Sequence, residues 1–97
     1  MSYSLHPQAE QDVADALDFY AAYAGALVVE RFLAESERVA HLISEFPDLG
    51  TRASKGRRAF PLQIFPYLVI YSSVEIGLRI LIVRHQRRKP TFGSGRR

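Results

Sequence analysis

The second half of the chain contains six residues whose side chains suit the binding of an anion: Arg57, Arg58, His85, Arg87, Arg88 and Lys89. The last three are consecutive, and neighbouring like charges repel one another unless a polyanion or an acidic peptide compensates them. A histidine titrates near neutral pH, so His85 could contact a phosphate or carry a proton. The sequence therefore predicts a target-binding or partner-binding surface here. The alternative is that such cations only solubilise strand ends and pair with acids, which is the interpretation that we favour for Arg79.

Other kinds of catalytic or metal site are not indicated by the sequence. The absence of cysteine excludes disulfides, thiolate ligands and thiol nucleophiles, and no phosphate-binding glycine loop, zinc-ligand spacing or nucleophile elbow occurs. Of the other histidines, His6 precedes a helix-opening proline as a cap, and His41 is expected on a helix surface. The spacing of Asp12, Asp15 and Asp18 predicts a solvated helix face rather than a metal site. We therefore expect neither a metal nor a cofactor.

Charge divides the chain into two halves. Residues 1–50 contain nine acids and two arginines, a net charge of −7, whereas residues 51–97 contain eleven lysines or arginines and one glutamate, a net charge of +10. A basic block of this kind indicates that the second half meets an anionic partner. Attraction between the two halves across the fold explains the same pattern, and both interpretations stay open at this point.

The first half predicts a short strand and two helices. Residues 2–6 alternate as a strand does, and Pro7 suits the first helical position because its missing N–H would be unpaired there. Apolar residues then recur at helical spacing up to Gly25, which ends the first predicted helix, and again up to Phe46, where Pro47 stops the second. Two amphipathic helices joined by one glycine predict an antiparallel hairpin, and their apolar stripes require a sheet to cover them.

The second half supplies that sheet. Residues 48–57 have loop composition, and three strands are predicted after them, in RRAFPLQ (57–63), PYLVIYSS (66–73) and LRILIVRHQ (78–86). Side chains alternate between the two faces of a strand, which predicts that Arg79 and His85 share one face.

These elements predict an α+β fold with the order β-α-α-β-β-β, in which the first strand and a three-stranded antiparallel unit form one small sheet. A single domain of residues 1–90 is expected, followed by a basic, mobile tail of residues 91–97. The first residues lack the basic start and apolar stretch of a signal peptide, and no apolar run approaches the roughly 18 residues of a membrane span. We therefore expect a soluble protein of the cytoplasm without membrane contact.

The order of these pieces resembles the RelE/ParE superfamily of bacterial toxin–antitoxin modules, and its ParE-like branch in particular. The residues that carry the resemblance are Pro7 with Ala9 and Asp12, FPDLG at 46–50, GRR at 56–58, FPYLVIY at 65–71 and ILIVRHQRRKP at 80–90. Together they span almost the whole chain. The resemblance implies a compact toxin of the plasmid-stabilisation type. It also implies a small cognate antitoxin with an acidic tail, which wraps the toxin in a hetero-oligomer and keeps it inactive.

The resemblance leaves the cellular target open. RelE-like members cut mRNA in the ribosome with cations that hold phosphate, a general base and an acid, whereas ParE-like members inhibit DNA gyrase without a catalytic set. Gln63 and Phe92 stand where RelE-like enzymes have an arginine and an aromatic hydroxyl, so two catalytic groups are missing and gyrase inhibition is the preferred hypothesis. One alternative is a ribosome-dependent mRNA endonuclease, in which Arg58 and Arg87 hold phosphate and His85 is the base. The other is an inert relative that keeps only antitoxin binding.

Overall fold

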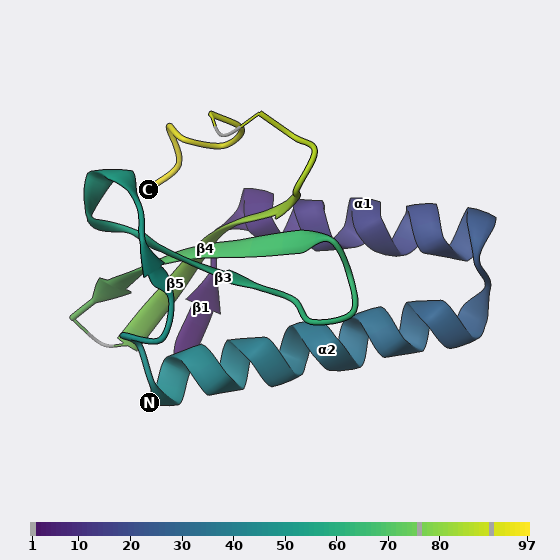
Figure 1. The fold of residues 1–97 in the computed structure, drawn as a ribbon, viewed down its shortest axis with the longest axis horizontal. Helices are drawn as coiled ribbons and strands as arrows, with labels where there is room; N and C mark the ends of the chain where they lie inside the picture. The colour runs from purple at the N-terminus through teal and green to yellow at the C-terminus, as the bar shows by residue number, and fades with distance from the viewer. Residues whose placement is uncertain (1, 76, 90) are drawn as a thin grey trace.

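A computed structural model describes residues 2–75, 77–89 and 91–97. These residues form two long helices and one sheet, in the order β1 (Tyr3–Leu5), α1 (Pro7–Tyr23), α2 (Ala26–Glu45), β2 (Thr51–Arg52), a 3₁₀ turn (Ser54–Gly56), β3 (Arg58–Pro61), β4 (Tyr67–Val74) and β5 (Gly77–His85). The sheet order is β1-β5-β4-β3-β2, with β1 parallel to β5 and the other neighbours antiparallel (Figure 1). The predicted α+β fold is confirmed, with one addition, since β2 lies in the segment that was expected to be loop.

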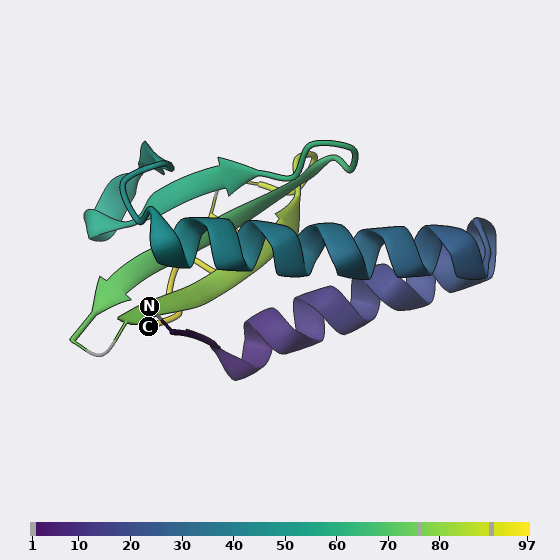
Figure 2. The same ribbon diagram turned by 90° about the horizontal axis from the view of Figure 1, so that it is seen from below.

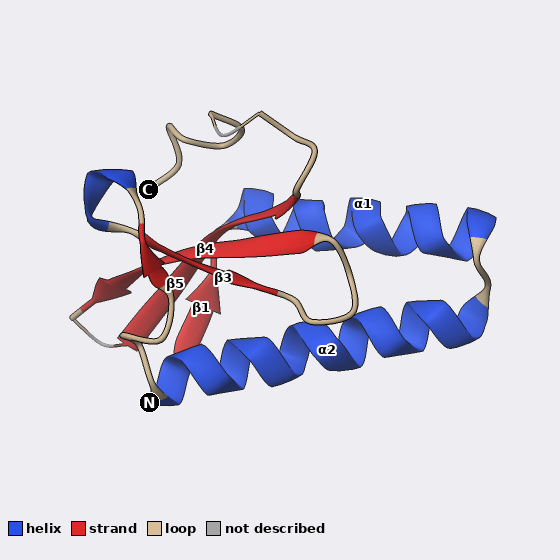
Figure 3. Cartoon of the chain, viewed as in Figure 1, coloured by secondary structure: helices blue, strands red, loops and turns tan. Residues whose placement is uncertain are grey.

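Helix α1 begins and ends where the sequence indicates. Pro7 is its first residue, and His6 Nδ1 accepts a hydrogen bond of 3.0 Å from the Gln8 N–H, as the prediction of a cap requires. After Tyr23 the chain reverses at Gly25, whose φ of 97° is a conformation that glycine adopts without a steric penalty. The helices form the predicted antiparallel hairpin, and its connection extends beyond the strands (Figure 3). In the described part of the chain, neither helix has the length and hydropathy needed to cross a membrane.

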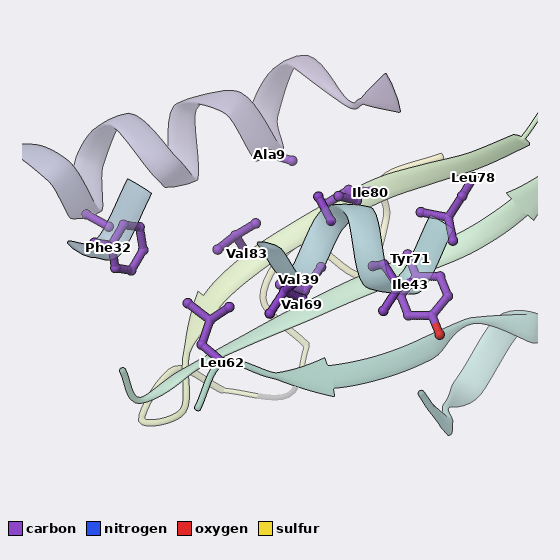
Figure 4. Close-up of a cluster of buried hydrophobic side chains, with 12 residues drawn as sticks. Ala9, Phe32, Val39, Ile43, Leu62, Val69, Tyr71, Leu78, Ile80 and Val83 are labelled. Carbon is purple, nitrogen blue, oxygen red and sulfur yellow. The ribbon is translucent and has the colours of Figure 1, made fainter. Parts of the chain in front are cut away.

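The two helices cover one face of the sheet (Figure 2), and the main core lies between these layers (Figure 4). Phe32 and Ile43 of α2 are completely buried, and Leu78 and Ile80 of β5 are exposed by only 1% and 3%. Burying such a side chain contributes about 1.5–3 kcal/mol. The core therefore fixes the helices against β5, and this arrangement shapes the candidate site described below.

A β-bulge in β5 changes which of its side chains face the helices. The register with β4 shifts by one residue at Leu81, which has no residue opposite it. Ile80 before the bulge and Val83 after it both belong to the core on the helix side, so His85 also faces that side, whereas Arg79 faces the open side. The prediction that Arg79 and His85 share a face is wrong, because it assumed strict alternation along the strand.

Tyr71 joins the sheet to the segment after α2. Its hydroxyl donates a hydrogen bond to the Pro47 carbonyl (2.7 Å) and accepts one from the Gly50 N–H (3.0 Å), and burial is the main cause that raises the pKa of Tyr71. Replacing Tyr71 with Phe should lower the free energy of unfolding by about 2 kcal/mol, because the buried Gly50 N–H and the partly buried Pro47 carbonyl lose their partner. Urea denaturation measures this loss. Tyr23→Phe is the matched control, since Tyr23 is 78% exposed, and equal losses in both variants would contradict this role.

Candidate binding site

A cleft of about 460 Å³ lies where α1 passes the end of β5. Its lining includes aromatic and basic side chains from α1, β4, β5 and the segment after β5, namely Phe19, Tyr20, Tyr67, Phe92, Arg84, His85, Arg87 and Arg88. Ligand sites combine apolar walls with a few charged or polar groups that orient the ligand. This cleft has that composition, and its basic groups would orient an anionic ligand.

Aromatic contacts fix the orientation of His85 in the wall of the cleft. His85 lies opposite Tyr67 in the neighbouring strand, with ring centroids 5.2 Å apart and an edge-on angle of 77°. The Tyr67 ring in turn packs against Phe32 of the core at 5.2 Å and faces Tyr20 of α1 at 6.4 Å. Edge-on aromatic pairs of this kind are stabilising beyond the area that they bury. The imidazole is therefore held by the same cluster that holds α1 on the sheet.

The hydrogen bond to His85 Nδ1 determines which ring nitrogen is left as a donor. Its Nδ1 accepts a hydrogen bond of 3.0 Å from the Arg87 N–H, so the neutral ring carries its proton on Nε2. In this tautomer Nε2 donates, and it has no lone pair with which to take a proton from a substrate. The geometry therefore suits His85 to binding an anion, and action as a general base would require the Arg87 turn to open first.

The charge of the cleft comes from its cations rather than from its tyrosines. Burial raises the pKa of Tyr20, and burial followed by the nearby Tyr20 raises that of Tyr67, so both phenols are neutral at neutral pH. The Arg88 guanidinium lies 5.0 Å from the centroid of the Phe92 ring, within the range of a cation–π contact. Two acids, Asp12 and Asp15, also line the cleft, and the Asp15 carboxylate accepts a hydrogen bond from Gln11.

The structure brings some of the predicted site residues together and keeps others apart. His85, Arg87 and Arg88 line the cleft, and Lys89 follows them as an exposed residue. Arg58 lies opposite Tyr71 and His85 lies opposite Tyr67.

Arg58 and His85 are separated along the sheet by four residues of strand, which is about 13 Å. Arg58 is instead engaged with the segment after α2, where its Nη1 donates to the Gly50 carbonyl at 2.9 Å. Arg57 is 8% exposed and lies under the C-terminal residues. The two basic groups thus occupy different ends of the sheet, and the function of each stays a prediction.

Asp12 lines the cleft as well, although the sequence did not indicate it as a site residue. It was expected on a solvated helix face, and this expectation is wrong, because Asp12 is only 8% exposed. Its Oδ2 accepts a hydrogen bond of 3.0 Å from the Val83 N–H, and its Oδ1 accepts one of 3.2 Å from Arg96. A signal was present in the sequence, since Ala9 and Ala16, at helical spacing on either side, are also buried.

Asp12 and Arg96 replace a missing strand partner. The pairing of β1 with β5 ends at Leu5 and Ile80, so the edge of β5 beyond this point is not covered by another strand. Asp12 accepts from the Val83 N–H on this edge, and Arg96 donates to the Leu81 carbonyl at 3.1 Å. Buried backbone groups must be paired, and these two side chains satisfy them. Among the described residues, no three His, Cys, Asp or Glu side chains are grouped as metal ligands.

The C-terminal residues 91–97 lie against the open face of the sheet, on the side away from the helices (Figure 2). Phe92 packs there against a second apolar cluster formed by Ile70, Leu81 and Ile82. These contacts give the tail a defined position in the fold. Its predicted mobility stays a prediction.

The end of the helix hairpin exposes a group of apolar side chains. Phe19, Tyr23 and Leu27 are 54%, 78% and 59% exposed. They belong to the last turns of α1 and the first turn of α2, next to the connection of the hairpin. Phe19 also lines the cleft, so the apolar surface is continuous with it. An exposed patch beside a charged cleft is typical of a protein-binding surface.

Comparisons with known proteins place this geometry in a family. The sequence matches the family model described as "ParE toxin of type II toxin-antitoxin system, parDE" over residues 3–90. A solved structure titled "Chromosomal ParDE TA system from P. aeruginosa" has a similar fold, with a TM-score of 0.65 and 16% sequence identity over 88% of this chain and 95% of that chain. At this identity the likeness shows the fold alone. No curated protein is significantly similar to the chain in sequence.

Proposed function

Since the chain belongs to the ParE toxin family of type II toxin–antitoxin systems, we propose that it inhibits DNA gyrase by binding and that a cognate antitoxin neutralises it in a hetero-oligomer. The proposed site of action is the cytoplasm. The family match covers almost all of the residues that line the cleft.

The observation that supports binding over catalysis is the hydrogen bond from the Arg87 N–H to His85 Nδ1. It leaves a donor at Nε2, beside the cations of Arg87 and Arg88. Such a set recognises carboxylates or phosphates, and its histidine is not placed to remove a ribose proton. Arg58, which the endonuclease alternative would need at the same site, lies about 13 Å away along the sheet.

The test compares two targets with one preparation of protein. At a stoichiometric excess over gyrase, the protein should inhibit the supercoiling of plasmid DNA or trap a cleaved complex. The same preparation should leave a translated mRNA intact. Codon-positioned cleavage of the mRNA without an effect on gyrase would overturn the proposal in favour of the endonuclease. No effect on either target, together with normal growth after induction, would identify an inert relative.

The antitoxin is proposed to bind as an extended segment across the hairpin and the sheet. Apolar burial over Phe19, Tyr23 and Leu27 would supply most of its affinity, because exposed ion pairs contribute only about 0–1 kcal/mol each. Its acids would approach Arg87 and Arg88. To reach the basic group at the other end of the sheet as well, the segment must cross about 13 Å, or roughly four extended residues.

A further inference from the structure

The turn after β5 is closed by two hydrogen bonds that both end on His85. The Arg88 N–H donates to the His85 carbonyl at 2.9 Å, and the Arg87 N–H donates to His85 Nδ1 at 3.0 Å. Aspartate and asparagine are common at the first position of a β-turn, because their side chains accept a hydrogen bond from the N–H two residues further on. His85 occupies this position with an imidazole, and a ring nitrogen accepts only while it carries no proton.

We infer that His85 is a positioning residue, whose Nδ1 closes the turn that holds Arg87 and Arg88 beside the cleft, and that a proton on the ring opens this turn. This role deepens the proposed function, on which its consequence for gyrase rests. Both arginines line the cleft and both are exposed. The positions of their side chains therefore depend largely on the backbone of the turn.

The surroundings of His85 keep its ring at the turn. Tyr67, opposite in β4, packs edge-on against the ring at 5.2 Å between centroids. The chain that enters the turn is anchored as well, since the Gln86 N–H donates to the Pro66 carbonyl at 2.8 Å. Because the ring cannot turn away without losing its packing, protonation is the event that removes the acceptor of the Arg87 N–H.

The charged groups around the ring add to the effect of this proton. Arginines of β5 and of the turn, and aspartates of α1, share the cleft with His85, namely Arg84, Arg87, Arg88, Asp12 and Asp15. The phenols of Tyr20 and Tyr67 are neutral, and Asp12 is already paired with Arg96. A proton on Nδ1 therefore brings a further positive charge close to three arginines, and like charges repel. It also places a donor against the Arg87 N–H, so both changes favour an open turn.

The dependence on pH separates this role from direct anion binding. Protonation leaves the donor at Nε2 and adds a charge, so direct binding alone predicts that an anion binds more tightly in acid. A positioning role predicts that the Arg87 hydrogen bond is present while the ring is neutral. This hydrogen bond should be lost as the pH falls through the titration of the ring.

Hydrogen exchange tests the inference on the full ¹⁵N-labelled chain between about pH 5 and pH 8. The protection of the Arg87 amide, measured as the ratio of its intrinsic to its observed exchange rate, should fall about fivefold as the ring takes up its proton. The ¹⁵N resonances of the His85 ring follow this titration in the same samples. The Gln86 amide is the matched control, because its acceptor, the Pro66 carbonyl, does not titrate, and its protection should stay constant.

Two substitutions of His85 separate the acceptor from the charge. His85→Asn keeps an acceptor at the first position of the turn, so the protection of Arg87 should equal that of the neutral parent and should not depend on pH. His85→Lys keeps a cationic donor for an anion and has no acceptor, so this protection should be about fivefold lower at every pH. His41→Asn, at an exposed position on α2, is the control and should behave as the parent does.

Inhibition of gyrase supercoiling shows whether the turn matters for activity. His85→Lys should inhibit about fivefold less than the parent in spite of its added charge, and His85→Asn should recover the inhibition. Stronger inhibition by His85→Lys than by the parent would assign His85 to direct anion binding instead. If the parent itself does not inhibit gyrase, the proposed function fails, and the exchange data decide the positioning role alone.

Three results of the exchange experiment would overturn the inference. They are constant protection of Arg87 through the titration of the ring, equal protection in His85→Lys and the neutral parent, or protection in His85→Asn as low as in His85→Lys. Circular dichroism checks that each variant is folded. If His85→Lys folds poorly, the titration of the parent and the comparison with His85→Asn still decide.

Discussion

Replacing Asp12 with Ala is expected to lower the free energy of unfolding by about 3 kcal/mol. The change leaves the Val83 N–H without its acceptor and Arg96 without its counter-ion, and both groups are buried. Removing one partner of a buried ion pair costs about 3–5 kcal/mol. The lower end applies here, because Arg96 can move into water with the tail. For a chain of this size the melting temperature should fall by more than about 10 °C.

Two further variants make this prediction specific. Asp15→Ala, three residues further along α1 at an exposed position, should change the stability by less than about 0.5 kcal/mol. Arg96→Ala should cost less than Asp12→Ala, since Asp12 keeps its hydrogen bond to Val83 and gains contact with water. Equal losses for Asp12→Ala and Asp15→Ala in chemical denaturation would show that the buried carboxylate does not hold α1 to β5.

Reversing the charge of Arg87 and Arg88 to Glu should slow association with an acidic antitoxin by about tenfold or more at low ionic strength. Both side chains line the cleft and belong to the turn after β5, so the fold should be preserved. Stopped-flow fluorescence measures the association rate, and circular dichroism checks the fold. The reversal removes the attraction between the partners, so the rate of the variant should also depend less on salt.

Salt supplies the internal control for this prediction. Above about 1 M the Debye length falls to about 3 Å, so the rates of the parent and the variant should converge. If the two rates already match at low ionic strength, the basic cluster does not guide the antitoxin. A direct role of Arg87 and Arg88 against the cellular target then becomes the better explanation.

The sequence predicts most of the fold because its local signals agree with one another. Pro7 and Gly25 mark the limits of the first helix, and Pro47 follows the second. The apolar periodicity and the helix-breaking residues therefore predict the same boundaries. β2 was missed because it has only two residues, Thr51 and Arg52, within a polar segment. A strand of this length has no detectable alternation, and it exists only through its pairing with β3.

The candidate site was less predictable, because it depends on contacts between distant parts of the chain. An aspartate such as Asp12 is typical of an exposed helix surface. In the fold, however, its carboxylate accepts a hydrogen bond from the N–H of Val83, 71 residues away. The bulge at Leu81 lies in an uninterrupted apolar run, where no glycine or polar residue marks it. The basic residues after β5 were predicted to be a site. Their separation from Arg58 depends on strand register, which a single sequence does not specify.

The parallel pairing of β1 with β5 has a consequence for how the protein is synthesised. Tyr3 lies opposite Leu78, which is made much later, and chains with such distant contacts fold slowly. During translation the two helices emerge long before the strand that covers them. A product that stops before Gly77 lacks the strand between β1 and β4, so β1 has no partner and the cleft cannot form. We expect interrupted messages to yield unfolded chains for proteolysis, and binding activity to arise only after the last strand has left the ribosome.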